Sequence, residues 1–438
     1  MMTPPARSLE RQLVEARRHD QGGASLHAEL LYSRILDEAH DNTEAASRLA
    51  HFAMLRGDTD RAATLLRSAF DHHPDNPQLG VELAVTQLCG SRSEEGIATL
   101  NATLKRTPEH SPAWLLLGDA RDAAGDSYGA LKAWYQAVTR AQRAGQWLDE
   151  RGTPPALLDS VVNAIEKVRL GRRELLFGAL DQLRNEYGGR ALQRVDRALT
   201  GYLREWDATP LDPRQRPRFL YFPDLPSQPF LDPFLQAWAG QLQDAFEMIR
   251  SEALQVIAED QSLPHFVDLK AGDRMQNYVT GQGPDPAWEA FFFYRHGRRY
   301  DANHRRCPQT SAVLESIELC RIADHAPEIC FSVMRPGTHI LPHYGVTNTR
   351  LVMHLPLVVP PNCALNLVDA GEHVWQEGKL VMFDDTFRHE AWNRSDSTRV
   401  VLLMDCWNPL LTHVEKKAIE RLIGMISGFH SAADIQPT

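Results

Sequence analysis

Residues 332–357 read SVMRPGTHILPHYGVTNTRLVMHLPL, and this stretch decides the fold of the second half of the chain. Short runs of apolar and β-branched residues predict strands at 328–334, 339–342 and 350–359. The RPG turn at 335–337 separates the first two runs, because glycine and proline suit tight turns rather than strand interiors. The spacing of these strands is typical of an antiparallel barrel of the jelly-roll kind.

The same alternation of short strands and turns continues toward the C-terminus. Further strands are predicted at 364–368, 379–383, 390–392 and 399–406, and turn residues stand at 360–362, 369–372 and 393–397. Helices are predicted at 230–257, 310–320 and 414–427. The second half is therefore expected to be a double-stranded β-helix (jelly-roll, cupin-like) domain with flanking helices.

Two histidines stand on the predicted strands in a pattern that has chemical meaning. His343 lies in HILPHYG, His389 lies in DDTFRHE, and Arg399 follows ten residues after His389. Non-haem iron oxygenases use two imidazoles with a carboxylate, usually two places after the first histidine, and an arginine can clamp the far carboxylate of an oxoacid. Here that place is Gly345, so the residues alone leave open a metal site or two ordinary core histidines.

Longer segments carry a resemblance to a known family. Residues 332–357, WQEGKLVMFDDTFRHEAWN at 375–393 and RVVLLMDCWNP at 399–409 resemble the aspartyl/asparaginyl β-hydroxylases, which are iron(II)- and 2-oxoglutarate-dependent dioxygenases. The resemblance reaches upstream through LPSQPFLDP and FYRHGRRYDANHRRCPQTSAVLESI and covers roughly 216–412. Members of this family carry glycine in place of the metal-binding carboxylate, as Gly345 stands here.

The resemblance implies a site and its cosubstrates. His343 and His389 would bind Fe(II), and Arg399 would pair with the far carboxylate of 2-oxoglutarate, with O₂ as the second cosubstrate. Ser332 and His354 would complete the 2-oxoglutarate pocket. The catalytic residues implied are thus His343, His389 and Arg399.

The substrate is less defined by the sequence. Asn348 and Arg350 follow the first histidine and are candidate substrate contacts, with turn and surface roles as the alternative. Asp384 and Asp385 precede the second histidine, and a structural role is favoured over orienting an imidazole. Val352 stands where the best-known protein hydroxylases of the family carry an arginine. A residue of a peptide or protein, aspartyl or asparaginyl or another, is the expected target, with a small molecule or a lipid acyl chain as alternatives.

The first half of the chain repeats with a period of 34 residues. Taking Ser111 as the first position, small residues stand at Gly118 and Ala130 and large ones at Trp114 and Trp134. Small residues let two antiparallel helices approach closely while large ones fill the gaps between hairpins. Earlier copies share the register, so residues 9–144 resemble a tetratricopeptide array, an arrangement also known in the hydroxylase family. Such an array could hold a peptide or protein partner or serve only as a spacer.

The remaining features set limits on domains and function. A helical connector is expected at 145–212 and the hydroxylase-like domain at 213–430, because prolines recur after 209. A net charge of −10 argues against a nucleic-acid partner, and no apolar run approaches the roughly 20 residues needed for membrane insertion. Six scattered cysteines and no apolar leader favour a cytoplasmic protein with reduced thiols.

Two non-hydroxylase hypotheses complete the set. A catalytically inactive scaffold would bind partners through the repeats, but its retained histidines and arginine would then have no use. A cupin-type metal barrel without an oxoacid would not need Arg399 and Ser332 together.

Overall fold

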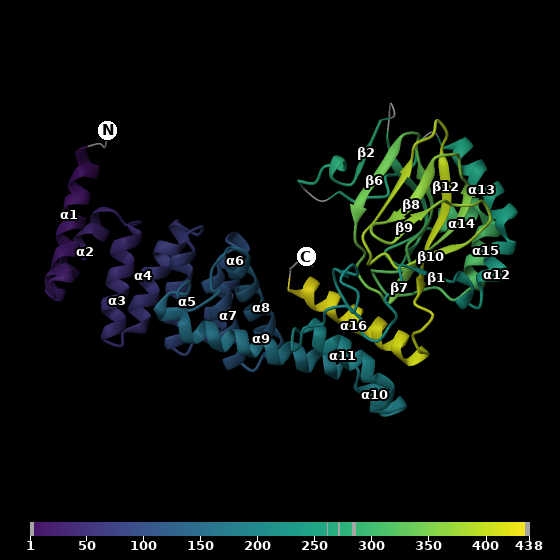
Figure 1. The fold of residues 1–438 in the computed structure, drawn as a ribbon. Helices are drawn as coiled ribbons and strands as arrows, with labels where there is room; N and C mark the ends of the chain where they lie inside the picture. The colour runs from purple at the N-terminus through teal and green to yellow at the C-terminus, as the bar shows by residue number, and fades with distance from the viewer. Residues whose placement is uncertain (1–3, 261, 270–271, 283–285, 434–438) are drawn as a thin grey trace. The chain divides into compact units, whose positions relative to one another are not determined.

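The computed structural model describes residues 4–260, 262–269, 272–282 and 286–433 (Figure 1). The chain divides into two compact units, Met1–Glu174 with Ser427–Thr438, and Leu175–Ile426. The division passes through two long helices, α9 (Leu158–Gly178) and α16 (His413–Ala432). The limits 9–144, 145–212 and 213–430 remain a prediction from sequence.

Unit 1 is an array of antiparallel helix pairs (Figure 1). The helices are α1 (Pro4–Gln21), α2 (Ser25–Glu38), α3 (Thr43–Leu55), α4 (Thr59–His72), α5 (Pro77–Cys89), α6 (Ser93–Arg106), α7 (Ser111–Ala123) and α8 (Ser127–Arg143). Asp58 and Asp126 cap helices by accepting backbone N–H groups, as short polar side chains do at helix N-termini. A Cβ on Gly118 would lie 2.3 Å from the Trp134 ring, which explains the small residue there. The predicted helical repeat array is confirmed.

Unit 2 is built on twelve strands, all in antiparallel pairings within the described residues. They are β1 (Phe230–Leu231), β2 (Val279–Gly281), β3 (Trp288–Arg295), β4 (Arg298–Arg299), β5 (Ile329–Met334), β6 (Thr338–His343), β7 (Arg350–Val358), β8 (Cys363–Leu367), β9 (Gly371–His373), β10 (Val381–Phe383), β11 (His389–Asn393) and β12 (Arg399–Trp407). A seven-stranded sheet runs β1-β10-β7-β12-β5-β3-β4, and a five-stranded sheet runs β2-β6-β11-β8-β9. The predicted C-terminal antiparallel β domain is confirmed.

Four helices flank the seven-stranded sheet: α12 (Ala239–Asp244), α13 (Phe246–Glu259), α14 (Asp301–Arg306) and α15 (Pro308–Ser316). The helices α10 (Asp181–Tyr187) and α11 (Gln193–Tyr202) pack with α16 in a separate core. The prediction of one helix over 230–257 was wrong in its first part, because Phe230–Leu231 pairs with β10 as β1. Asp232 then begins a short 3-10 turn at Pro233–Leu235 by accepting the Phe234 N–H. No described helix is both long and apolar enough to cross a bilayer.

The two faces of the seven-stranded sheet bury different side chains. Leu351, Met353, Leu355 and Leu357 of β7 join the core that includes Ile249 of α13. Since successive strand residues point to opposite faces, His354 points to the other face, as do Ser332 of β5 and Arg399 of β12. That face belongs with a second core of residues from both sheets, including Phe383 of β10 and Ala391 of β11. Three predicted site residues therefore lie on the inner face of the sheet.

Candidate iron and 2-oxoglutarate site

The two predicted metal ligands lie side by side on the five-stranded sheet. His343 ends β6 and His389 begins β11, the two residues are direct partners in the ladder, and their ring centroids are 4.1 Å apart. A register shift follows, because Ala391 pairs with Ile340 rather than with Leu341. Such a bulge re-aims a side chain, which lets both imidazoles point to the same space.

Backbone contacts fix which ring nitrogen of each histidine is free. The Nδ1 atom of His343 lies 2.8 Å from the Leu341 carbonyl oxygen, and Nδ1 of His389 lies 3.0 Å from that of Phe387. A carbonyl oxygen can only accept a hydrogen bond, so both Nδ1 atoms carry the proton and both Nε2 lone pairs are available. Burial lowers the pKa of His343 and lowers that of His389 to about 3, so both rings are neutral near pH 7.

Gly345 leaves room for a carboxylate from another loop. A Cβ at position 345 would lie 2.1–2.2 Å from the carboxyl atoms of Asp385, which precedes β11. The Gly345 N–H also donates to the Asp385 carbonyl oxygen at 2.6 Å. Burial raises the pKa of Asp385 to about 8. The position that lacks a carboxylate in sequence is thus next to one in space.

Asp384 has a different, structural role. Its carboxylate accepts hydrogen bonds from Gln215 Nε2 at 2.7 Å and from the Thr386 N–H at 2.9 Å, and burial raises its pKa to about 6. These contacts hold the turn between β10 and β11. The contacts of Asp384 are those of a residue that stabilises a turn, as favoured from sequence. Asp385 instead lies against Gly345, two residues after His343.

Arg399 is a buried cation that has no carboxylate partner among the residues that the structure describes. Its side chain is 2% exposed, and its Nη1 donates to the carbonyl oxygen and the hydroxyl of Ser332 at 3.3 and 3.4 Å. The guanidinium lies 4.5 Å from the centroid of the Trp375 ring, and its Nε has no hydrogen-bond partner. Burial lowers its pKa to about 10. Because burying an unpaired charge is costly, this geometry suits a site that receives an anion.

His354 connects the arginine to the two histidines. Both of its ring nitrogens are buried without a hydrogen-bond partner in the described part of the chain, and its ring lies 5.9 Å from Trp375 and 5.3 Å from Phe383. The Phe383 ring in turn lies 5.5 Å from His389. Burial lowers the pKa of His354 well below its ordinary value. A continuous line of side chains therefore joins the paired imidazoles to Arg399.

The two candidate substrate contacts are engaged within the protein. Asn348 is buried, accepts the Phe222 N–H and donates to the Phe222 carbonyl oxygen, both at 2.8 Å. Arg350 forms an ion pair with Asp405. That Asn348 and Arg350 bind the substrate stays a prediction. Their bonds within the protein argue against it.

Sequence reasoning missed Trp375, and it missed the contact of Asp385 with Gly345. Trp375, which stacks on Arg399, stood in the quoted segment 375–393 but had no charge or ligand atom to mark it. Asp385 was separated from Gly345 by forty residues, and only the fold shows that they touch. Among the described residues, no group of three or more His, Cys, Asp or Glu side chains is placed to hold a metal.

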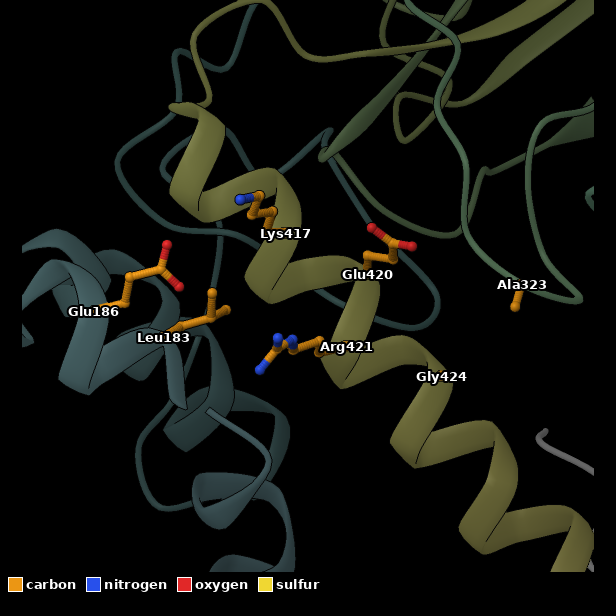
Figure 2. A pocket seen from close by; sticks show the side chains of 7 residues that line it. All are labelled: Leu183, Glu186, Ala323, Lys417, Glu420, Arg421 and Gly424. Atoms are coloured by element: carbon orange, nitrogen blue, oxygen red, sulfur yellow. The ribbon is translucent and has the colours of Figure 1, made fainter. Parts of the chain in front are cut away.

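An open cleft elsewhere in unit 2 has no such chemistry. It has a volume of about 440 Å³ between α10 and α16 (Figure 2). Its lining residues are Leu183, Glu186, Ala323, Lys417, Glu420, Arg421 and Gly424. Lys417 is held by the Tyr187 hydroxyl and Arg421 by Gln182, so its cations already have partners.

Comparisons with known proteins agree with this architecture. Residues 243–409 match the family model described as aspartyl/asparaginyl beta-hydroxylase, and residues 53–120 match a tetratricopeptide repeat model. The chain thus carries a domain of the aspartyl/asparaginyl β-hydroxylase family together with tetratricopeptide repeats.

Individual relatives are hydroxylases or hydroxylase-domain proteins by name. The chain is 35% identical over 193 residues to the ornithine lipid ester-linked acyl 2-hydroxylase of Rhizobium tropici, covering 44% of this chain and 64% of that protein. It is 29% identical over 256 residues to human aspartate beta-hydroxylase domain-containing protein 2, covering 57% and 66%. It is 34% identical over 185 residues to human aspartyl/asparaginyl beta-hydroxylase, covering 41% of this chain and 22% of that one.

Among solved structures, a crystal structure of MamA protein matches at 16% identity with a TM-score of 0.30. The match covers 42% of this chain and 96% of that one. A score this low supports no conclusion about fold or function.

Proposed function

We propose that the protein is an Fe(II)- and 2-oxoglutarate-dependent dioxygenase that hydroxylates an unactivated C–H bond. One observation carries the proposal: two adjacent neutral imidazoles, each with Nδ1 at a backbone carbonyl, are joined through the rings of Phe383, His354 and Trp375 to a buried guanidinium that has no carboxylate partner among the described residues. Neutral imidazoles are good iron ligands, and a buried arginine suits a carboxylate of an oxoacid. The family of the domain supports the same reading.

The residues present fit this cofactor set. His343 and His389 would hold the iron through Nε2, with the backbone carbonyls fixing their orientation as outer partners do in metal sites. Arg399 and the Ser332 hydroxyl would bind the far carboxylate of 2-oxoglutarate, and the unpartnered nitrogens of His354 offer it a further hydrogen bond. Asp385, whose carboxyl group lies against Gly345, would hold or release a proton there.

When bound, iron and 2-oxoglutarate supply the oxidising power: O₂ is consumed, 2-oxoglutarate becomes succinate and CO₂, and one oxygen atom is left for the substrate. The protein's own side chains bind, orient and exclude water. Phe383, Trp375 and the apolar core around them keep the pocket dry, which strengthens the interaction of Arg399 with an anion.

The proposed substrate is an aspartyl, asparaginyl or other residue in a peptide or protein, which the repeats of unit 1 could hold. A lipid acyl chain or small molecule is the second candidate. It is favoured by the Rhizobium relative and by Val352, which packs with the apolar core on the inner face. A cytoplasmic location, in keeping with six unpaired cysteines, belongs to the same proposal.

The test measures succinate formed from 2-oxoglutarate with Fe(II) and O₂. Wild-type protein should turn over slowly even without a substrate, and His343→Ala or His389→Ala should lower the rate at least roughly 100-fold by removing a ligand. His339→Ala is the matched control, because His339 also lies on β6 but pairs with Glu390 at 2.7 Å. Equal rates in wild type and His389→Ala would reject the proposal in favour of a non-catalytic scaffold.

A further inference from the structure

Trp375 is a buried tryptophan whose indole nitrogen is not used within the described part of the protein. Its side chain is 2% exposed, and its Nε1 atom is buried without a hydrogen-bond partner among the described residues. An indole N–H can only donate a hydrogen bond, and a buried donor without an acceptor lowers stability. Such an atom suits an acceptor that comes from outside the chain.

The backbone around Trp375 is fixed on both sides. Before it, β9 pairs with β8. After it, the Gly378 N–H donates to the carbonyl oxygen of Pro356 in β7 at 3.0 Å, and the Glu377 carboxylate accepts the Val359 N–H at 3.0 Å. The position of the indole is therefore set by the two sheets rather than by a free loop.

The indole lies among other unpaired nitrogen atoms. Its ring centroid is 4.5 Å from the guanidinium carbon of Arg399 and 5.9 Å from the ring centroid of His354. Within the described residues, Nε of Arg399 and both ring nitrogens of His354 also lack hydrogen-bond partners. Guanidinium and indole groups only donate, and a neutral imidazole donates from one of its two nitrogens. Three of these four unpaired nitrogen atoms are therefore donors.

A carboxylate fits this donor-rich cluster better than a water molecule does. A carboxylate has two oxygen atoms with about four lone-pair sites, so it can accept from several donors at once. Its charge also offsets that of the buried Arg399, and charge-assisted hydrogen bonds are the stronger kind. A water molecule would leave the guanidinium charge without a partner.

We propose that the indole N–H of Trp375 donates a hydrogen bond to the far carboxylate of 2-oxoglutarate beside Arg399. This inference rests on the proposed function and adds a binding residue to it. Trp375 then acts in two ways: its ring supports the guanidinium through a cation–π contact, and its N–H orients the carboxylate. The other end of the cosubstrate stays free to reach the paired histidines.

The first test observes the indole directly in full-length protein that carries ¹⁵N-labelled tryptophan and Zn(II) in place of Fe(II). The chain has 9 tryptophans, and the signal of Trp375 is identified by its loss in Trp375→Phe. Adding 2-oxoglutarate should move this N–H proton resonance downfield and slow its exchange with water, because the N–H gains a charged acceptor. 2-Oxobutyrate, which lacks the far carboxylate, should leave the resonance in place.

The second test measures affinity by isothermal titration calorimetry on the same zinc-loaded protein. Trp375→Phe keeps an aromatic ring on Arg399 but has no N–H, so it should bind 2-oxoglutarate about 10-fold more weakly. Trp238→Phe is the matched control, because Trp238 also has a buried, unpartnered Nε1 but packs in the core on the other face of the seven-stranded sheet. The control should bind 2-oxoglutarate as wild type does. Thermal denaturation confirms that both variants are folded.

The outcomes separate this inference from the proposed function. The role of Trp375 is overturned if 2-oxoglutarate binds wild type but leaves the Trp375 resonance in place, as it would if the residue only supported Arg399. It is also overturned if 2-oxobutyrate causes the same shift, or if Trp375→Phe binds within about twofold of wild type. In these cases wild type still binds 2-oxoglutarate, so the proposed function stands. If wild type neither binds 2-oxoglutarate nor forms succinate, both proposals are rejected.

Discussion

The buried Arg399 lowers the stability of the ligand-free protein and, for the same reason, favours binding of a carboxylate. Its guanidinium is buried, and within the described residues its Nε has no hydrogen-bond partner and its hydrogen bonds go to Ser332 alone. Desolvating a charge costs free energy unless an opposite charge joins it. In the ligand-free protein this desolvation lowers the free energy of unfolding, and a bound carboxylate would offset the loss.

Replacing this arginine should stabilise the ligand-free protein while removing 2-oxoglutarate binding. For Arg399→Met we expect the free energy of unfolding to rise by about 1–2 kcal/mol, since methionine fills similar volume without a charge. Urea unfolding with and without 2-oxoglutarate measures both effects. A variant that is less stable than wild type, or that 2-oxoglutarate still stabilises, would contradict the role given to Arg399.

The burial of His354 predicts how the free energy of unfolding changes with pH. Burial holds its pKa well below the ordinary value of 6.5, so the folded protein keeps this imidazole neutral while the unfolded chain binds a proton below that pH. The unfolded state then binds more protons, and stability falls as pH drops below 6.5. His354→Gln should lessen the loss of metal-free stability between pH 7.5 and 5.5 by about 1 kcal/mol. An identical loss in both proteins, measured by urea unfolding, would refute this.

The identity of the candidate site residues could be predicted from sequence, but the tautomers of the two histidines could not. His343, His389 and Arg399 stand in segments with a characteristic order. The partners that fix their tautomers are the backbone carbonyls of Leu341 and Phe387, which any residue would supply. Sequence carries no signal for such contacts.

Strands with alternating or turn-bounded patterns were predicted well. The strand expected at 350–359 is β7 (Arg350–Val358), and the one expected at 399–406 is β12 (Arg399–Trp407). β3 (Trp288–Arg295) was missed, because seven of its eight residues are buried and its apolar run at 290–294 shows no period of two. The bulge in β6 was also missed, since it depends on pairing with β11.

The close contact between Gly345, after β6, and Asp385, in the β10–β11 turn, predicts the effect of a substitution on stability. A methyl group there would meet the Asp385 carboxylate, so in Gly345→Ala either this buried side chain or the β10–β11 turn that carries it must shift. We expect the free energy of unfolding to fall by about 1–3 kcal/mol, as for overpacked sites. Gly240→Ala, in α12 with nothing near its Cβ, is the matched control and should be neutral or stabilising by up to about 1 kcal/mol. Equal stability of the two variants, in chemical denaturation, would argue against the close approach.

For the whole molecule, the two-part architecture could be predicted from the sequence because each half has its own residue pattern. The 34-residue repeat marks the helical array, and short strands with turns mark the β domain. The division between compact units was not visible, because it falls inside the continuous helices α9 and α16. A long helix gives no turn residues to mark a boundary within it.

The central claim is that one pocket of this chain binds Fe(II) and 2-oxoglutarate together. The most direct measurement adds both to the purified full-length protein without oxygen and follows the weak visible absorption band of the iron–oxoacid complex. We predict a saturable band with one iron per chain in wild type. It should be lost in His389→Ala and should need far more 2-oxoglutarate in Arg399→Met. No band in folded wild-type protein supplied with iron, or an equal band in His389→Ala, would contradict the claim.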